Sequence, residues 1–308
     1  MEQQPLVSVI INCYNGEKYL REAIDSVIAQ TYTNWEIIFW DNQSTDSTAE
    51  IVKSYKDERI RYFYAPEHTP LGEARNLAMK EANGKFISFL DADDIWLSGF
   101  LCSGIQMLKD KSNLQGYYSN YTNLYTNSEI NHDEDVQSHE VDLKELLNYY
   151  NIGMSGIILR YDTIRNNDIK FDKNYNLIED LDFFVKVSSY GNLFYDSTPL
   201  FKYRIHAGSA SFKRSSEWHK EYKQFLSQIR ETYIVNNKLS ENDLWRIFKV
   251  DFAAQLETCI MGDKRLSFIK LFLRRPYYLR FYWRFWLFVF VGRDQYIKFR
   301  NRRYFFNR

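Results

Sequence analysis

Cysteine is scarce in this sequence of 308 residues, which contains three: Cys13, Cys102 and Cys259. An odd number without paired spacing argues against a disulfide framework or a zinc site and suits a reducing compartment. The sequence also lacks an apolar run of about 18 residues, the minimum for a membrane-spanning helix. Its first residues show no basic segment followed by an apolar one, so we expect no signal peptide and a cytoplasmic protein.

Net charge is also absent, because 40 basic residues balance 40 acidic ones. The two signs are unevenly distributed: residues 264–308 carry 13 Lys or Arg and one acid, Asp294, so the net charge is +12 there and −12 in the rest. Such a separation bears on binding partners rather than on fold. The length suits one large α/β domain with an appendage, which we place at residues 1–214 and 215–308.

Apolar strand-like segments alternate with amphipathic helical ones in the first third of the chain. Strands are expected at residues 6–11, 35–40, 60–64 and 85–90, with helices at 17–30, around 51–55 and at 71–82. The pair Asn83–Gly84 is expected to end the third helix in a left-handed conformation. This alternation predicts the α/β class, with a mainly parallel sheet flanked by helices.

The pattern becomes mixed beyond Lys111. Further strands are expected at 116–125, 155–160 and 201–204, an acidic surface loop at 126–140, a helix that opens at Glu179, and a helical region from 217 onward. No internal repeat is apparent. The C-terminal region is therefore expected to be a helical extension of the α/β domain.

Three carboxylates follow the expected strand 85–90: Asp91, Asp93 and Asp94. In extended backbone, residues two apart point the same way, so Asp91 and Asp93 can face one site. Aligned carboxylates repel each other unless a cation is present, and Mg²⁺ or Mn²⁺ binds one or two of them together with phosphate oxygens and water. The alternative is a solvated turn in which Asp94 caps a helix at 95–111. Ligands of such sheets bind at the carboxyl ends of the strands, where 12–16 and 41–46 also lie.

Eight short motifs occur in the order seen in one enzyme family. They are Val7–Ile11, Tyr14–Asn15, Gln30–Tyr32, Asp41–Asp46, Ala74–Asn76, Leu90–Asp94, Glu179–Asp180 and Tyr203–His206. In these motifs residues 5–211 resemble family 2 glycosyltransferases. The resemblance implies the GT-A (Rossmann-like) fold and an inverting transfer of a sugar from a nucleotide-diphosphate donor, with Mn²⁺ or Mg²⁺ as cofactor.

The resemblance also implies roles for individual residues. Donor-binding residues would be Asn12, Tyr14, Asn15, Asp41, Asn42, Arg75, Asp91 and His206, and metal ligands Asp93, Asp91 and His206. The alternative for Arg75 is an exposed helix arginine, and Asp94 is left open as a second metal ligand or a helix cap. Tyr14 would stack on the base, and its alternative is a tyrosine covering the sheet edge. Asn42 replaces a second aspartate common in the family, but an amide still reads uracil or thymine, so UDP or dTDP is the expected donor nucleotide. Cys13 is interpreted as a packing residue.

The resemblance places the catalytic base at Asp180, which would deprotonate the acceptor hydroxyl. Glu179 and Asp180 are about 100° apart on a helix, so only one is expected to face the acceptor. The structural alternative is that these acids merely stabilise the positive end of a helix. His206, in a serine-rich segment that reaches Arg214, would close over the diphosphate. The hypothesis requires Asp93 and Asp180 to open into one cleft.

The C-terminal stretch 264–308 interleaves 16 aromatic residues with arginines such as Arg280 and Arg284. This pattern is typical of a helix lying in the interface of an anionic membrane, which predicts a peripheral protein at the inner face of the cell membrane. The alternatives left open are a cap packed on the acidic body and a homodimer contact. Nucleic-acid binding is not expected, because no recognisable module accompanies the pattern.

The expected function is transfer of a sugar to a glycan or a lipid-linked acceptor of a bacterial surface polysaccharide. Two other functions remain as alternatives: a sugar-nucleotide nucleotidyltransferase and a non-catalytic membrane adaptor. The first would carry a Gly-rich basic loop after the first strand, and residues 12–18 contain one Gly and one Lys. The second would have no reason to retain both Asp93 and Asp180.

Overall fold

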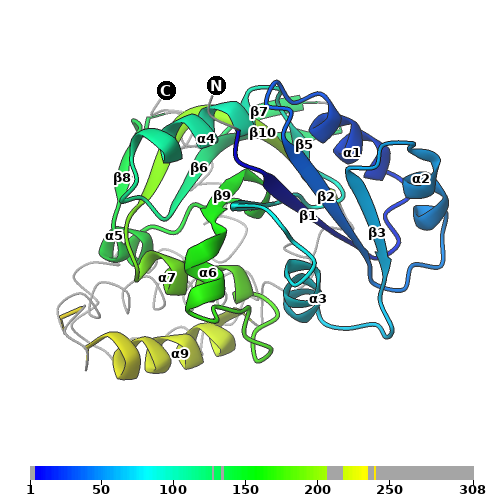
Figure 1. Cartoon of the computed structure of the whole chain (residues 1–308). Helices are drawn as coiled ribbons and strands as arrows, with labels where there is room; N and C mark the ends of the chain where they lie inside the picture. Colours follow the sequence, from blue (N-terminus) through cyan, green and yellow to red (C-terminus); the bar gives the residue numbers. More distant parts are fainter. Residues whose placement is uncertain (1–3, 127, 133–134, 207–217, 235–238, 241–308) are drawn as a thin grey trace, which may run out of the picture. The chain divides into compact units, whose positions relative to one another are not determined.

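The computed structural model describes residues 4–126, 128–132, 135–206, 218–234 and 239–240 (Figure 1). The chain divides into two units, Met1–Lys213 and Arg214–Arg308. In the second unit, the described residues include helix α9 (Trp218–Ile229) and a short π-helix, η2 (Arg230–Ile234). The predicted membrane-binding stretch 264–308 lies outside the described residues.

The described part of the first unit is built on one ten-stranded sheet in the order β3-β2-β1-β4-β9-β6-β10-β5, with β7 paired to β6 and β8 to β10. The strands are β1 (Val7–Cys13), β2 (Trp35–Asp41), β3 (Ile60–Tyr64), β4 (Phe86–Phe89), β5 (Ile95–Trp96), β6 (Gly116–Tyr125), β7 (Ser128–Asn131), β8 (His139–Val141), β9 (Ile157–Arg160) and β10 (Leu193–Arg204). Strands β1 to β4 are mutually parallel, and β6 pairs parallel to β10. Strands β5, β7, β8 and β9 pair antiparallel. The predicted mainly parallel α/β architecture is confirmed.

Helices cover both faces of the sheet (Figure 1). They are α1 (Leu20–Ile28), α2 (Thr48–Ser54), α3 (Leu71–Met79), α4 (Phe100–Asp110), α5 (Leu143–Asn148), the 3₁₀ turn η1 (Met154–Gly156), α6 (Tyr161–Asn166) and α7 (Glu179–Ser188). Val9 of β1 belongs to an apolar cluster with α1 and α4. On the other face, Phe89 of β4 packs edge-on against Phe171 and against Phe183 of α7. Burial on both faces explains why these strands are almost continuously apolar.

Several predicted boundaries were wrong. The helix expected at 95–111 starts only at Phe100, because Ile95 and Trp96 pair with β10 as strand β5. The loop expected at 126–140 contains β7 and part of β8. Helix α3 ends at Met79, and Gly84 is not left-handed. A Cβ at Gly84 would lie 2.6 Å from the Ser8 backbone nitrogen, so close packing, not a turn, requires this glycine.

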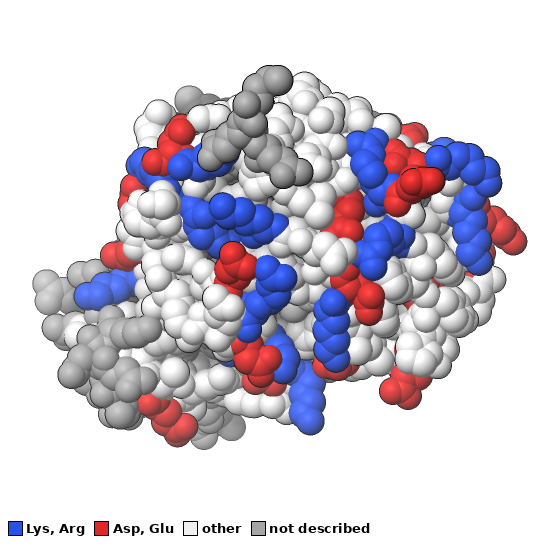
Figure 2. Space-filling model, in the orientation of Figure 1, with Lys and Arg blue, Asp and Glu red and all other residues white. Residues whose placement is uncertain are grey.

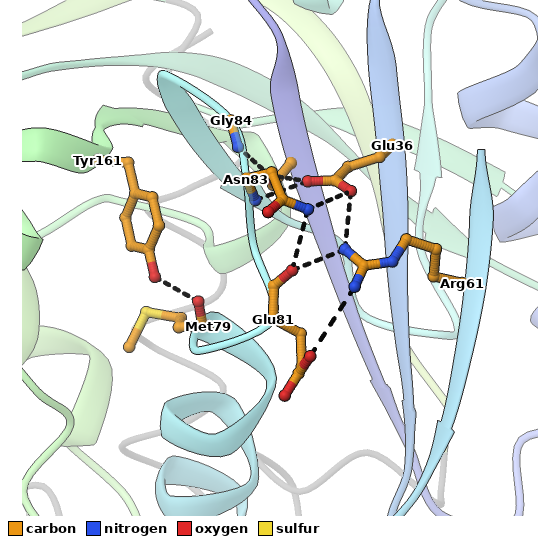
Figure 3. Close-up of polar contacts among 8 residues, drawn as sticks. Glu36, Arg61, Met79, Glu81, Asn83, Gly84 and Tyr161 are labelled. Carbon is orange, nitrogen blue, oxygen red and sulfur yellow. Dashed lines mark hydrogen bonds and ion pairs between the residues drawn. The ribbon is translucent and has the colours of Figure 1, made fainter.

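A buried carboxylate joins the starts of three strands, at the end remote from the acidic turn that follows β4 at residues 91–94. Glu36 of β2 accepts hydrogen bonds from Ser8 Oγ (2.7 Å), from the backbone N–H of Asn83 (2.7 Å) and from Arg61 Nη1 (3.0 Å) (Figure 3). Burial alone would raise the pKa of Glu36, but these donors hold it below its ordinary value. The contacts tie the segment after α3 to strands β1, β2 and β3.

The face seen in Figure 2 carries positive and negative side chains next to one another, as expected for a solvated surface. Among the described residues, no helix is long and apolar enough to cross a bilayer.

Candidate active site

A cavity of about 840 Å³ opens where β1 and β4 end. It is lined by Asn12, Cys13, Tyr14, Asn15, Gly16, Lys18, Tyr19, Leu71, Arg75, Asp91, Ala92, Asp93, Asp94, Tyr121, Ile152, Gly153, Met154, Asn176, Leu177, Glu179, Asp180, Tyr203 and His206. These residues come from strand ends, from β6, from α3, from the segment before α1, from the segment between α5 and η1 together with η1 itself, and from the start of α7 with the residues before it. Asp93 and Asp180 open into the same cavity, as the hypothesis requires.

Two predicted donor-binding residues do not line the cavity. Asp41 is fully buried, and its carboxylate accepts from the Ser44 backbone N–H (2.7 Å) and from the Tyr62 hydroxyl (2.7 Å). The Asn42 side chain donates to the carbonyl of Thr69 (2.8 Å) and accepts from its backbone N–H (3.1 Å). Both side chains shape the turns around the site, because their polar atoms are already bound within the protein.

Tyr14 lines the cavity, is 54% exposed and meets the ring of His68 edge-on at 4.5 Å. Asn15 adopts a left-handed backbone (φ 56°), and its side-chain oxygen accepts from the Thr45 backbone N–H (2.8 Å). Asn12 Nδ2 is buried without a hydrogen-bond partner in the described structure. A buried donor without a partner is costly unless a ligand or water accepts from it.

Asp93 and His206, which both line the cavity, form a pair. His206 Nε2 lies 2.8 Å from Asp93 Oδ2. Burial and the nearby charge of Asp91 raise the pKa of Asp93, although His206 opposes the effect. Arg204, two residues before His206, donates to the backbone carbonyl of Asp93 (2.8 Å) and to Glu22 (2.9 Å). The end of β10 is thereby attached to the acidic turn.

Asp94 is neither a helix cap nor a residue exposed for ligation. It is 1% exposed, and its carboxylate accepts from Ser155 Oγ (2.5 Å) and from the Arg204 backbone N–H (2.9 Å). Burial, together with the charges of Asp91 and Asp93, raises the pKa of Asp94 well above its ordinary value. Asp94 therefore connects the acidic turn to η1 and to β10.

Arg75 lies between two carboxylates rather than exposed on its helix. Its side chain is 4% exposed, with Nη2 3.0 Å from Asp91 Oδ1 and Nη1 3.3 Å from Glu179 Oε1. Burial raises the pKa of Glu179 to about 7, although Arg75 opposes the effect. Arg75 thus links the acidic turn to the first turn of α7, and its positive charge offsets part of the negative charge of Asp91 and Glu179.

Asp180 has different partners from Glu179. The Tyr150 hydroxyl donates to its Oδ2 (2.8 Å), and the Leu181 backbone N–H donates to its Oδ1 (2.7 Å). Burial raises the pKa of Asp180, while the Tyr150 hydrogen bond lowers it. Both acids line the cavity. Glu179 is paired with a charged group, Arg75, whereas the two donors to Asp180 are neutral.

Cys13 is buried, and burial raises the pKa of its thiol to about 12. A protonated buried thiol packs as a small apolar group, which agrees with the prediction. The serine-rich segment after His206, which is predicted to close over the diphosphate, lies at residues 207–214, outside the described residues.

Sequence reasoning missed Tyr150, Ser155 and Arg204. Arg204 belongs to the motif Tyr203–His206, which could have drawn attention to it. Tyr150 and Ser155 had no such signal, because they belong to the region where no motif was recognised. Their roles depend on contacts with Asp180 and Asp94, which lie 30 and 61 residues away in the sequence.

The carboxylates and the imidazole of the cavity differ in their fit to Mn²⁺ or Mg²⁺. Within the described ranges, no cluster of three or more His, Cys, Asp or Glu residues is arranged to hold a metal ion. Asp93 Oδ2 and His206 Nε2, 2.8 Å apart, are close to the spacing of about 3 Å between neighbouring ligands of an octahedral ion with bonds of about 2.1 Å. Asp91 is bound to Arg75 instead. The pair fits a cation whose remaining ligands come from a diphosphate and water.

Comparison with known proteins identifies the class. The chain is 36% identical over 154 residues to the Escherichia coli UDP-Glc:alpha-D-GlcNAc-diphosphoundecaprenol beta-1,3-glucosyltransferase WfgD, across 50% of this chain and 60% of that protein. It is 32% identical over 216 residues to the E. coli enzyme of the same description, WfaP, across 69% of this chain and 82% of that protein. The sequence model of the family described as "Glycosyl transferase family 2" matches residues 8–132. The chain belongs to glycosyl transferase family 2.

Solved structures agree on the fold. Residues 1–349 of Staphylococcus aureus TarS in complex with UDP-GlcNAc superpose with a TM-score of 0.70 at 18% identity, covering 86% of this chain and 79% of that chain. The mannosyltransferase PcManGT from Pyrobaculum calidifontis, in complex with GDP-Man and Mn²⁺, superposes with a TM-score of 0.58 at 15% identity, covering 96% and 86%. The predicted GT-A fold is confirmed.

Proposed function

We propose that this glycosyltransferase is an inverting, metal-dependent enzyme that moves a sugar from a nucleoside-diphosphate donor to a hydroxyl of a lipid-linked glycan. The observation that carries the proposal is the shared cavity, which brings the Asp93–His206 pair and Asp180 together. UDP is the favoured donor nucleotide because WfgD and WfaP are described as UDP-Glc enzymes, and their acceptor is a diphosphoundecaprenol-linked sugar.

The residues divide the chemistry between two walls of the cavity. Asp93 and His206 would hold Mn²⁺ or Mg²⁺, which supplies Lewis acidity to the departing diphosphate when bound. Tyr14 would stack on the base and Asn12 Nδ2 would donate to the donor nucleotide. Asp180 accepts the proton of the acceptor hydroxyl. At the same time the acceptor oxygen bonds to the anomeric carbon of the sugar, and the bond between that carbon and the diphosphate breaks. Attack opposite the leaving group inverts the anomeric centre.

A thermal-shift panel of UDP-, dTDP- and GDP-sugars, with and without Mn²⁺, tests donor binding. We expect a UDP-sugar with Mn²⁺ at about 100 times its dissociation constant to add about 2.7 kcal/mol of stability. Asp93→Ala should abolish the Mn²⁺-dependent part of this gain, because one ligand of the cation is lost. Asp162→Ala, which removes an exposed acid on α6, is the control and should respond like the wild type. A protein that no donor stabilises would contradict the proposal.

Asp180→Asn tests the base. The amide can still accept from Tyr150, so we expect a folded protein that binds the donor and loses transfer by about 100-fold or more. Burial raises the pKa of Asp180. As the pH is lowered, wild-type transfer should therefore be lost at a higher pH than it would be if the base had the pKa of an ordinary aspartate. The measurement is UDP release with a polyprenyl-diphosphate-linked sugar acceptor. Turnover by Asp180→Asn at the wild-type rate would show that the base lies elsewhere.

A further inference from the structure

Tyr150 contacts the candidate base from outside the cavity. It belongs to the segment between α5 and η1, and its hydroxyl donates to Asp180 Oδ2 at 2.8 Å. Asp180 lines the cavity, whereas Tyr150 is absent from its lining. The Leu181 backbone N–H donates to Oδ1 at 2.7 Å. Each carboxylate oxygen therefore has one protein donor and retains lone-pair capacity for a substrate hydroxyl.

We propose that Tyr150 is a positioning residue, which orients the carboxylate of Asp180 toward the acceptor hydroxyl. The inference rests on the proposed function, because Tyr150 acts only through Asp180. A base must lie within hydrogen-bond reach of the proton that it removes, and a carboxylate free to rotate loses this alignment. No other residue described in this structure donates a side-chain hydrogen bond to Asp180.

The neighbouring contact fixes the same turn of α7 from a second side. Glu179 Oε1 lies 3.3 Å from Arg75 Nη1 of α3. The first turn of α7 is thus held through Glu179 by Arg75 and through Asp180 by Tyr150. Two anchors on adjacent residues restrict both the rotation and the displacement of this turn, which is the support that a precisely placed base requires.

The surrounding charges determine where the proton goes. The charged and titratable groups around Asp180 include Glu179 on α7, Arg75 on α3 and Tyr150 itself. Burial, together with the negative charges of Asp180 and Glu179, raises the pKa of Tyr150 well above its ordinary value. The phenol therefore keeps its proton and acts only as a donor. The acceptor's proton moves to Asp180, whose ionised form the Tyr150 hydrogen bond favours.

The test compares the full-length wild type with Tyr150→Phe, Asp180→Asn and the double variant, using transfer rates measured across a range of pH. Tyr150→Phe should lower kcat by about 10- to 100-fold and change the donor KM by less than about twofold. It should also move the acid limb of the pH–rate profile to higher pH, because Asp180 loses a hydrogen bond that favours its ionised form. In the Asp180→Asn background the same substitution should change the residual rate little. Tyr149→Phe alters an exposed neighbouring tyrosine and is the matched control, expected to keep the wild-type profile.

The outcomes separate this inference from the proposed function. Wild-type turnover by Asp180→Asn would refute Asp180 as the base. If Asp180→Asn is inactive but the acid limb of the Tyr150→Phe pH–rate profile is unmoved, the positioning role is overturned and the proposed function is not. This holds whatever the rate of Tyr150→Phe. Unfolding midpoints of the wild type, Tyr150→Phe, Asp180→Ala and their double variant give a second measurement should Tyr150→Phe be too unstable to assay. Alanine removes the acceptor of the Tyr150 hydrogen bond, so non-additive midpoints are expected, and additive ones would refute the contact.

Discussion

Glu36 shows at the level of one residue how a buried charge can stabilise this fold. Its side chain is 9% exposed and accepts from donors on three segments: Ser8, Arg61 and Asn83 (Figure 3). A buried carboxylate is stabilising only where its hydrogen bonds are made, because removing its partners leaves the charge uncompensated. Glu36 is therefore a structural residue, at the end of the strands remote from the candidate active site.

Glu36→Ala should lower the free energy of unfolding by about 3 kcal/mol, because the buried Ser8 hydroxyl and the part-buried hydrogen bonds from Asn83 and Arg61 lose their acceptor. Chemical denaturation measures the effect, and donor binding by the folded fraction should be unchanged. Glu129→Ala, which breaks an exposed pair with Lys202, is the control and should cost less than about 1 kcal/mol. Equal losses for the two variants would show that the Glu36 network adds no stability.

The pH dependence of this contribution follows from its sign. The folded-state pKa of Glu36 lies below its ordinary value, so the stabilisation is complete above that ordinary value and is lost as the pH falls through the folded-state pKa. Glu36→Gln should flatten this part of the acid unfolding profile. A profile identical to the wild type would mean that other carboxylates account for the acid sensitivity.

At the level of elements, the site is assembled by connections between strand ends. The acidic turn after β4 is joined to β10 through Asp94 and Arg204, and to α7 through Asp91 and Arg75. Each connection uses a side chain already bound within the protein. The arrangement predicts that substitution of Arg204, which does not line the cavity, alters donor or acceptor binding without direct contact with the ligand.

Gly84 marks the place where the segment after α3 crosses β1. A Cβ there would lie 2.5 Å from the Phe86 carbonyl oxygen and 2.6 Å from the Ser8 backbone nitrogen, and backbone atoms cannot move aside cheaply. Gly84→Ala should therefore destabilise the protein by about 2 kcal/mol or more, as measured by denaturant unfolding. At Gly99 a Cβ would meet nothing within 4 Å, so Gly99→Ala is the control, expected to cost less than about 1 kcal/mol. Similar values for both would refute the packing argument.

At the level of the whole molecule, the sequence separates a net charge of −12 in residues 1–263 from +12 in residues 264–308. The aromatic and basic residues of the latter stretch suit binding to an anionic membrane surface, where a lipid-linked acceptor would be found. We propose this location for the enzyme on the sequence pattern alone, because the stretch lies outside the described residues.

Sedimentation with liposomes tests the membrane proposal. The full-length protein should pellet with anionic vesicles, less so at high salt, and the variant carrying both Arg280→Glu and Arg284→Glu should pellet less, because two attractive charges become repulsive. Neutral vesicles and a variant lacking residues 264–308 complete the comparison. Pelleting that is independent of these changes would remove the idea.

Much of the fold could be read from local patterns. The alternation of apolar strands and amphipathic helices up to Leu90, and the strand 116–125, depend on side-chain periodicity, which neighbouring residues carry. The start of α4 could not be read in this way. Ile95 and Trp96 suit a helix by sequence, but hydrogen bonding to β10, about 100 residues later, makes them a strand.

The sequence by itself determined which residue types stand at the ends of the strands and at the start of α7, because these are local properties of the chain. Only the tertiary structure decided which partner each acid takes: Asp91 binds Arg75, Asp94 binds Ser155, and Asp180 binds Tyr150. The physical reason is that burial raises the cost of an unpaired charge, so each carboxylate is defined by the donors that distant segments bring to it. No periodicity in the sequence encodes those distances.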